Sequence, residues 1–117
     1  MSAAPSFNVL VAFSVSPMGG SDSVSDAVAA CVGLVRDSGL ANETNAMFTN
    51  VEGPYDQVMA LVGRCIERCA AEAPRVSVTL KLDHRPGHED ALHTKVERVE
   101  SRLAARLELT DEAAPDV

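Results

Sequence analysis

The chain has 117 residues, which is enough for one domain and too few for two ordinary ones. Its 46% hydrophobic content is typical of a globular domain, and because only 3% of residues are aromatic, the core must consist of Val, Leu, Ala and Met. The formal net charge is −7 and Lys and Arg do not cluster, which argues against a nucleic-acid partner.

The apolar segments do not predict a membrane or secreted protein. The apolar run 7–15 is far shorter than the ~20 residues of a membrane-spanning helix, and the residues before it lack the basic region of a signal peptide. Cys31, Cys65 and Cys69 lie in apolar helical patterns without CxxC spacing, which predicts buried thiols in a reducing compartment. We therefore expect a cytoplasmic protein with no membrane partner.

The first strand and helix are predicted in the first third of the chain. Residues 7–15, FNVLVAFSV, alternate so that Phe and Val fill one face. The segment SVSPMGG, 14–20, follows as a turn. Ser23-Val-Ser-Asp26 has the form of a helix N-terminus, apolar residues recur at helical spacing as far as Val35, and Gly39 ends the helix.

The middle of the chain predicts two short strands, a helix and a longer strand. The strands cover 41–47 and 49–52, and the helix runs from Pro54 to about Glu72. The segment 75–83, RVSVTLKLD, is the clearest strand, with its aliphatic residues predicted to face inward. These are Val76, Val78, Leu80 and Leu82.

A third helix follows the loop 84–90. Its apolar side consists of Leu92, Val96, Val99, Leu103 and Leu107. The element order βαββαβα predicts an α+β fold: a ferredoxin-like βαββαβ sandwich with a four-stranded antiparallel sheet and an additional C-terminal helix. We expect a single domain over 7–109, a disordered N-terminus over 1–6 and a disordered acidic tail over 110–117.

Both helices of such a sandwich cover one face of the sheet and leave the other open. The open face carries a mixed set of side chains, which predicts packing against a second subunit with ligands at the seam. The set is Leu10, Ala12, Ser14, Ser77, Thr79 and Lys81. Alternating charges at Arg75, Lys81, Asp83 and Arg85 fit salt bridges at that interface.

Polar side chains gather at the end of the first strand and in the following hairpin. Hydroxyls, amides and one carboxylate can orient a nitrogen heterocycle, because each polar atom of the ring needs a partner once it leaves water. They also serve as caps of turns and helices, and position alone does not separate the two roles. The residues are Ser14, Ser16, Asn45, Thr49, Asn50 and Glu52.

Catalytic and metal-binding motifs find little support. No serine lies in a G-x-S-x-G turn and no cysteine has a histidine close in sequence. His84, His88 and His93 match no standard zinc spacing and are typical of an exposed polar loop. Cys65 and Cys69 lack further soft ligands. We expect no cofactor and no metal.

Four motifs in order make the chain resemble the small thiamine-binding protein family. They are Ser14-Val-Ser-Pro-Met-Gly19, Met47-Phe-Thr-Asn-Val-Glu-Gly53, Arg75-Val76 with Lys81-Leu-Asp83-His-Arg85, and Lys95-Val-Glu-Arg-Val-Glu100. The resemblance covers nearly the whole chain. Phe48 departs from it, because the family has glycine between the Met and the Thr of the second motif.

The resemblance implies a non-catalytic protein that binds thiamine or its hydroxymethylpyrimidine moiety, near a subunit interface of dimers paired into tetramers. Glu52 would pair with the aminopyrimidine edge, with Thr49, Ser14 and Ser16 as further contacts. Phe48 reshapes or closes the pocket, or stacks on the heterocycle, and the amide of Asn50 compensates.

Two alternatives remain open. One is a small ferredoxin-like enzyme in which Glu52 or a loop histidine transfers a proton in a pocket at the dimer interface. The other is a structural module in which the open face and the third helix serve assembly alone.

Overall fold

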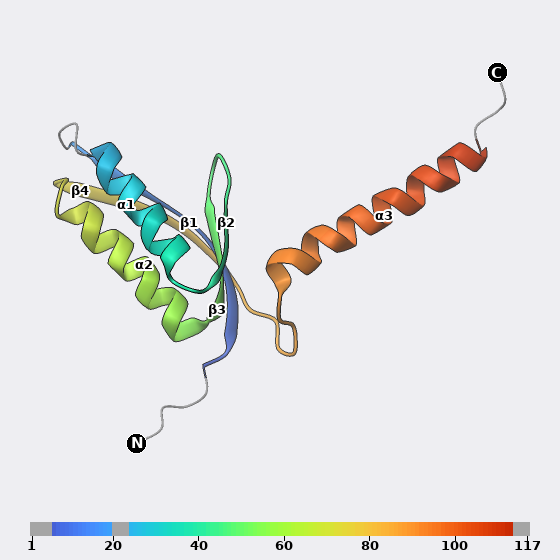
Figure 1. The fold of residues 1–117 in the computed structure, drawn as a ribbon, viewed down its shortest axis with the longest axis horizontal. Coiled ribbons are helices and arrows are strands. Elements are labelled where there is room, and N and C mark those ends of the chain that lie inside the picture. The colour runs from blue at the N-terminus through green and yellow to red at the C-terminus, as the bar shows by residue number, and fades with distance from the viewer. Residues whose placement is uncertain (1–5, 20–23, 114–117) are drawn as a thin grey trace.

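The computed structural model describes residues 6–19 and 24–113 and contains four strands and three helices within them (Figure 1). The order confirms the predicted α+β ferredoxin-like arrangement with an additional C-terminal helix. The elements are β1 (Asn8–Met18), α1 (Val24–Asp37), β2 (Ala41–Thr44), β3 (Thr49–Pro54), α2 (Tyr55–Ala70), β4 (Arg75–Asp83) and α3 (Ala91–Ala113).

The sheet is antiparallel throughout, with strand order β2-β3-β1-β4. Val11 of β1 lies opposite Val51 on one side and Leu82 on the other, so the apolar residues of three strands share one face. Helices α1 and α2 lie side by side over this face, as predicted (Figure 1). The core between the helices and the sheet consists of aliphatic and cysteine side chains, with Phe13 as its one aromatic member.

Strand β1 extends three residues beyond the predicted end at Val15. Its last residues, through Met18, pair with β4 as far as Arg75, whereas pairing with β3 ends at Phe13. The strand therefore has a partner on only one side from Ser14 onward, and such an edge accommodates Pro17 without loss of a ladder hydrogen bond. The predicted turn over 14–20 is wrong for 14–18, and the helix start predicted at Ser23 lies outside the described residues.

The hairpin strands differ in length from the prediction. Strand β2 ends at Thr44 and not at residue 47, while β3 continues to Pro54, directly before α2. Gly53 within β3 is favoured by packing, because a Cβ atom there would lie 2.9 Å from Cδ2 of Leu40, which would have to move. That distance is below the contact distance of two carbon atoms, so the glycine allows β3 to lie against the α1–β2 connection.

Strand β4 has the predicted bounds but is less buried than predicted. Its aliphatic residues face the same side as the core residues of β1, because Leu80 lies opposite Phe13 and Val78 opposite Val15. Val78, Leu80 and Leu82 nevertheless remain 36–38% exposed. The reason is that β4 is an edge strand and the two helices do not reach across its outer side.

Helix α3 projects away from the sandwich and extends the molecule to 63 Å (Figure 1). Its first turn lies near β3, and Leu92 there is buried. The helix continues to Ala113, four residues into the segment expected to be a disordered tail, and 114–117 lie outside the described residues. Within 6–19 and 24–113, no helix has the length and apolar character to cross a bilayer.

Candidate functional site

The loop 45–48 closes the β2–β3 hairpin around one asparagine side chain. Oδ1 of Asn45 accepts hydrogen bonds from the backbone N–H groups of Met47 and Phe48, both at 2.9 Å. The backbone N–H of Asn45 donates to the carbonyl of Phe48, also at 2.9 Å. An asparagine that bonds to the backbone two and three residues ahead fixes a turn without the usual Asn-Gly pair. The predicted ligand residue Asn45 thus builds the loop with its oxygen.

This loop forms one wall of a recess of about 180 Å³, which we call the hairpin cleft. The end of β1 and the outer face of α1 form the other walls. The cleft is lined by Phe13, Ser14, Val15, Val28, Cys31, Val32, Val35, Thr44, Asn45, Ala46, Met47, Phe48 and Thr49. Four of the seven residues predicted from sequence to contact a ligand therefore line the cleft: Ser14, Asn45, Phe48 and Thr49. The side chain of Ser14 follows buried Phe13 in β1 and so belongs to the open face, opposite Thr79.

The hairpin cleft is apolar on one side and hydrogen-bonding on the other. Val28, Cys31 and Val32 provide the α1 wall, where Val28 is 40% exposed. Thr44, Asn45, Phe48 and Thr49 of the hairpin line the opposite side, and none of the described residues that line the cleft is acidic or basic. A pocket of this composition suits a small uncharged ring that needs a few directed hydrogen bonds. The α1 wall was not predicted from the sequence.

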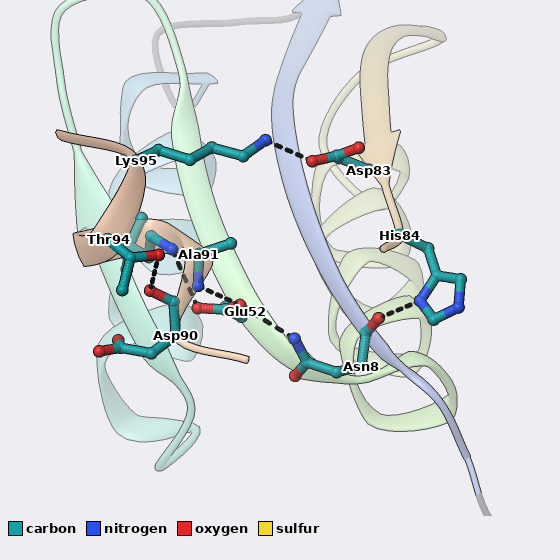
Figure 2. A network of polar contacts seen from close by, with 9 residues as sticks. Asn8, Glu52, Asp83, His84, Asp90, Ala91, Thr94 and Lys95 are labelled. Carbon is teal, nitrogen blue, oxygen red and sulfur yellow. Dashed lines mark hydrogen bonds and ion pairs between the residues drawn. The ribbon is translucent and has the colours of Figure 1, made fainter. Parts of the chain in front are cut away.

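Glu52 lies on the other face of the sheet from Thr49. In β3 these residues differ by three positions, and Glu52 shares the open face with Leu10, its cross-strand neighbour. Its carboxylate is 5% exposed and accepts three hydrogen bonds (Figure 2). Oε2 accepts from Nδ2 of Asn8 at 2.9 Å and from the backbone of Ala91 at 2.7 Å, and Oε1 accepts from the backbone of Leu92 at 3.1 Å.

These bonds attach the start of α3 to the sheet. The first N–H groups of a helix have no partner inside the helix, and a carboxylate there also interacts favourably with the helix dipole. Asp90, just before the helix, has a positive φ of 59°, and its carbonyl accepts from the backbone of Thr94 at 3.0 Å. In this structure Glu52 holds α3, a role that sequence reasoning missed because the partner groups are backbone atoms.

The remaining predicted ligand residues do not line the hairpin cleft. Ser16 is exposed on the open face, opposite Ser77. Asn50 is also on the open face, where its Nδ2 donates to the carbonyl of Glu43 at 3.5 Å. The seven residues are therefore divided between two faces of the sheet.

The open face carries a second depression, which we call the open-face groove. It consists of recesses of about 170 and 30 Å³ that share Leu10, Asp83 and Lys95. Lys95 of α3 forms an ion pair with Asp83 of β4 and reaches across β1 to do so (Figure 2). Hydrogen bonding to Lys95, and the further positive charges of Lys81 and Arg85, lower the pKa of Asp83.

The three loop histidines have separate roles. Nδ1 of His84 hydrogen-bonds the carbonyl of Asn8 at 2.6 Å, and its ring packs on Phe7, which also stacks on Tyr55. His88 lines the open-face groove. Nδ1 of His93 lies 2.7 Å from Oδ1 of Asp90, which raises the pKa of His93. In 6–19 and 24–113, no group of three or more His, Cys, Asp or Glu is arranged to hold a metal ion.

The prediction of buried thiols is confirmed. Cys31 of α1 meets Cys65 and Cys69 of α2, with 3.4 Å between the Sγ atoms of Cys31 and Cys69. Sγ of Cys31 donates to the carbonyl of Cys65 at 3.3 Å. Burial raises the pKa of Cys31, and contact with the two neighbouring thiols raises it further; burial also raises the pKa of Cys65. The thiols of Cys31 and Cys65 are therefore neutral near pH 7.

Comparison with known proteins shows to which family this chain belongs. A sequence model of the family described as thiamine-binding protein matches residues 11–100. The chain belongs to the thiamine-binding protein family. A UPF0045 protein of Mycobacterium bovis is 52% identical over 97 residues, which cover 82% of this chain and 95% of that protein.

Solved structures agree with this assignment. A hypothetical protein of Methanocaldococcus jannaschii superposes with a TM-score of 0.71 at 28% identity, over 80% of this chain and 96% of that one. A Thermotoga maritima protein, named as a candidate thiamine biosynthesis/salvage protein, has a TM-score of 0.68 at 21% identity, over 79% and 98% of the two chains. At that identity the Thermotoga structure supports the fold alone. The hairpin cleft lies within the matched region of the family.

Proposed function

We propose that this protein binds thiamine or its hydroxymethylpyrimidine moiety in the cytoplasm and releases it unchanged. The observation that carries the proposal is the hairpin cleft, which Ser14, Asn45, Phe48 and Thr49 line within the region that defines the family. The volume, about 180 Å³, is below the ~300 Å³ of the smallest pockets that enclose whole drug-sized ligands. It suits one heterocycle, so the pyrimidine ring enters and the remainder of thiamine stays outside.

The chemistry of the lining supports the same orientation. An aminopyrimidine edge offers donors and acceptors that match the hydroxyl of Thr49, while its face matches the ring of Phe48. None of the described residues that line the cleft is a carboxylate that could pair with the cationic thiazolium. Toward solvent it meets the field of a protein with net charge −7.

The geometry favours binding over proton transfer by Glu52. A general base needs an oxygen within hydrogen-bond reach of the substrate proton. Both oxygens of Glu52 already accept hydrogen bonds from Asn8 and the start of α3, on the face of the sheet opposite the cleft. We therefore propose Thr49 as the first polar contact, with Asn45 shaping the loop.

Calorimetric titration with thiamine and with hydroxymethylpyrimidine tests the proposal. Thr49→Val removes the hydroxyl at nearly constant shape, so it should weaken binding about three- to tenfold. Ser77→Ala, an exposed serine on β4 away from the cleft, is the matched control. Absence of binding by either compound at sub-millimolar concentration would overturn the proposal. Chromatography of the recovered ligand tests turnover, since a consumed ligand would indicate an enzyme.

Phe48 separates two versions of this proposal. If its ring stacks on the ligand, Phe48→Leu weakens binding, because aromatic pairs contribute beyond their buried area. If the ring narrows the cleft, Phe48→Gly, which restores the family residue, strengthens binding. The sign of the change in affinity therefore identifies which role the ring has.

We further propose that the protein is a homo-oligomer, a dimer or a pair of dimers, assembled through α3. Past its first turn the helix has an exposed apolar stripe. Its members, Val96, Val99, Leu103 and Leu107, are 51–64% exposed. Exposed aliphatic residues at helical spacing on a projecting helix are typical of a subunit interface.

A further inference from the structure

The open-face groove concentrates positive charge in an acidic protein. Lys81, Arg85, Lys95 and Arg98 line it, which is four of the ten Lys and Arg residues of a chain with net charge −7. They come from β4, from the loop after it and from the first two turns of α3. Residues separated by as much as 17 positions thus converge on one depression.

The two acidic residues that line the groove are already compensated. Glu52 is nearly buried and accepts three N–H hydrogen bonds, and Asp83 is paired with Lys95. In the described part of the chain, no carboxylate lies within ion-pair distance of Arg85 or Arg98. Two guanidinium groups therefore line one groove without an ion-pair partner among the described residues.

The rest of the groove offers an apolar floor beside this charge. Leu10 and Ala12 of the central strand β1 form the floor, in register with Asp83 and Lys81 of β4, and the amide of Asn50 lies at the far side. Guanidinium groups bind phosphate oxygens in pairs of parallel hydrogen bonds, and a lysine adds a compact charge. An apolar floor suits the ring or chain that carries the phosphate.

We propose that the open-face groove binds a small phosphate monoester, with its phosphate between Arg85 and Arg98 and its organic part over Leu10 and Ala12. Lys95 exchanges Asp83 for the phosphate when the ligand enters. The sheet separates this site from the hairpin cleft. Phosphate binding in the groove can therefore be tested independently of thiamine binding in the cleft. The net charge of −7 on the whole chain disfavours a polyanion such as nucleic acid.

Titration of the full chain with phenyl phosphate, inorganic phosphate and benzyl alcohol tests the site. Arg85→Gln and Arg98→Gln should each weaken phenyl phosphate binding about tenfold, because each removes a charge-assisted contact. Arg75→Gln is the matched control, since Arg75 is an exposed arginine on the same face of β4 that does not line the groove. Raising the salt concentration should weaken binding further.

Asp83→Asn gives a prediction of opposite sign. It removes the exposed carboxylate and frees Lys95, so phenyl phosphate should bind more tightly, whereas a purely structural ion pair would leave affinity unchanged. Two results would overturn the proposal: equal affinity of the two arginine variants and the wild type, or binding of benzyl alcohol as tight as that of phenyl phosphate. If inorganic phosphate binds as tightly as phenyl phosphate, the apolar floor does not contribute to binding and the placement of the organic part is wrong. Circular dichroism establishes that each variant is folded.

Discussion

The backbone N–H of Ala91 donates a 2.7 Å hydrogen bond to the carboxylate of Glu52, which lies 39 residues earlier in the chain. This bond, with those from Leu92 and Asn8, makes Glu52 the link between strand β3 and the projecting helix α3. The carboxylate is almost wholly buried, so its removal leaves helix N–H groups without partners. Glu52 therefore holds the first turn of α3 against the sheet.

Glu52→Gln should lower the free energy of unfolding by about 1–3 kcal/mol, the usual cost of leaving buried polar groups unsatisfied. Glutamine has the same shape but only one accepting oxygen, so it cannot satisfy the donors of Ala91, Leu92 and Asn8 together. Urea unfolding measures the loss, and hydrogen exchange of the amides of Ala91 and Leu92 should become faster.

Glu43→Gln is the control for this variant, because Glu43 is exposed on β2 and also loses one negative charge. It should leave both stability and exchange at the start of α3 nearly unchanged. If Glu52→Gln keeps full stability and loses only the ligand, Glu52 is a binding residue and not the anchor of α3.

Asp90 should control the titration of His93. Asp90 bonds Nδ1 of His93 and its negative charge favours the protonated ring, which raises the pKa of His93 above the ordinary value of about 6.5. The contribution to stability is therefore complete below pH about 6.5 and is lost as the pH rises through the folded-state pKa.

Asp90→Asn should return the pKa of His93 toward its ordinary value. Asparagine tolerates the positive φ of this position, so the backbone is preserved while the charge is removed. Titration of the His93 ring protons by NMR measures the shift. An unchanged pKa in the variant would show that Asp90 is not its cause.

The three thiols should be unreactive in the folded protein. Burial and mutual contact raise the pKa of Cys31, burial raises that of Cys65, and only the thiolate reacts rapidly. A disulfide reagent at pH 7 should therefore modify none of the three on the time scale in which it modifies all of them in urea. Rapid reaction of Cys31, which lines the hairpin cleft, would show that the cleft opens far enough to expose it.

Much of the fold follows from local patterns. The alternation in residues 75–83 predicts the bounds of β4. Successive side chains of a strand point to opposite faces, and polar and aliphatic side chains alternate through these nine residues without interruption. The same alternation gives the core face of β1, where Val9, Val11 and Phe13 are buried. Exposure at Leu80 and its neighbours was not predictable in this way, since it depends on where the helices stop.

The candidate site was only half predictable for a related reason. Thr49 and Glu52 are three positions apart in one strand, and strand parity alone places them on opposite faces, a signal present in the sequence. The sequence does not indicate the partners of Glu52. These are the backbone N–H groups of Ala91 and Leu92, and nearly every residue type has such a group. The path of α3, and with it the open-face groove, is a tertiary property.

Assembly through α3 should be sensitive to one charge on its apolar stripe. Val99 is 57% exposed in the single chain, and in the proposed interface its burial contributes about 1.5–3 kcal/mol. Val99→Glu loses that contribution and buries an unpaired carboxylate, so subunit affinity should fall at least tenfold. Ser101→Glu, which adds the same charge outside the stripe, should retain the wild-type mass. Size-exclusion chromatography with light scattering measures both, and a monomeric wild type at tens of micromolar would contradict assembly through this helix.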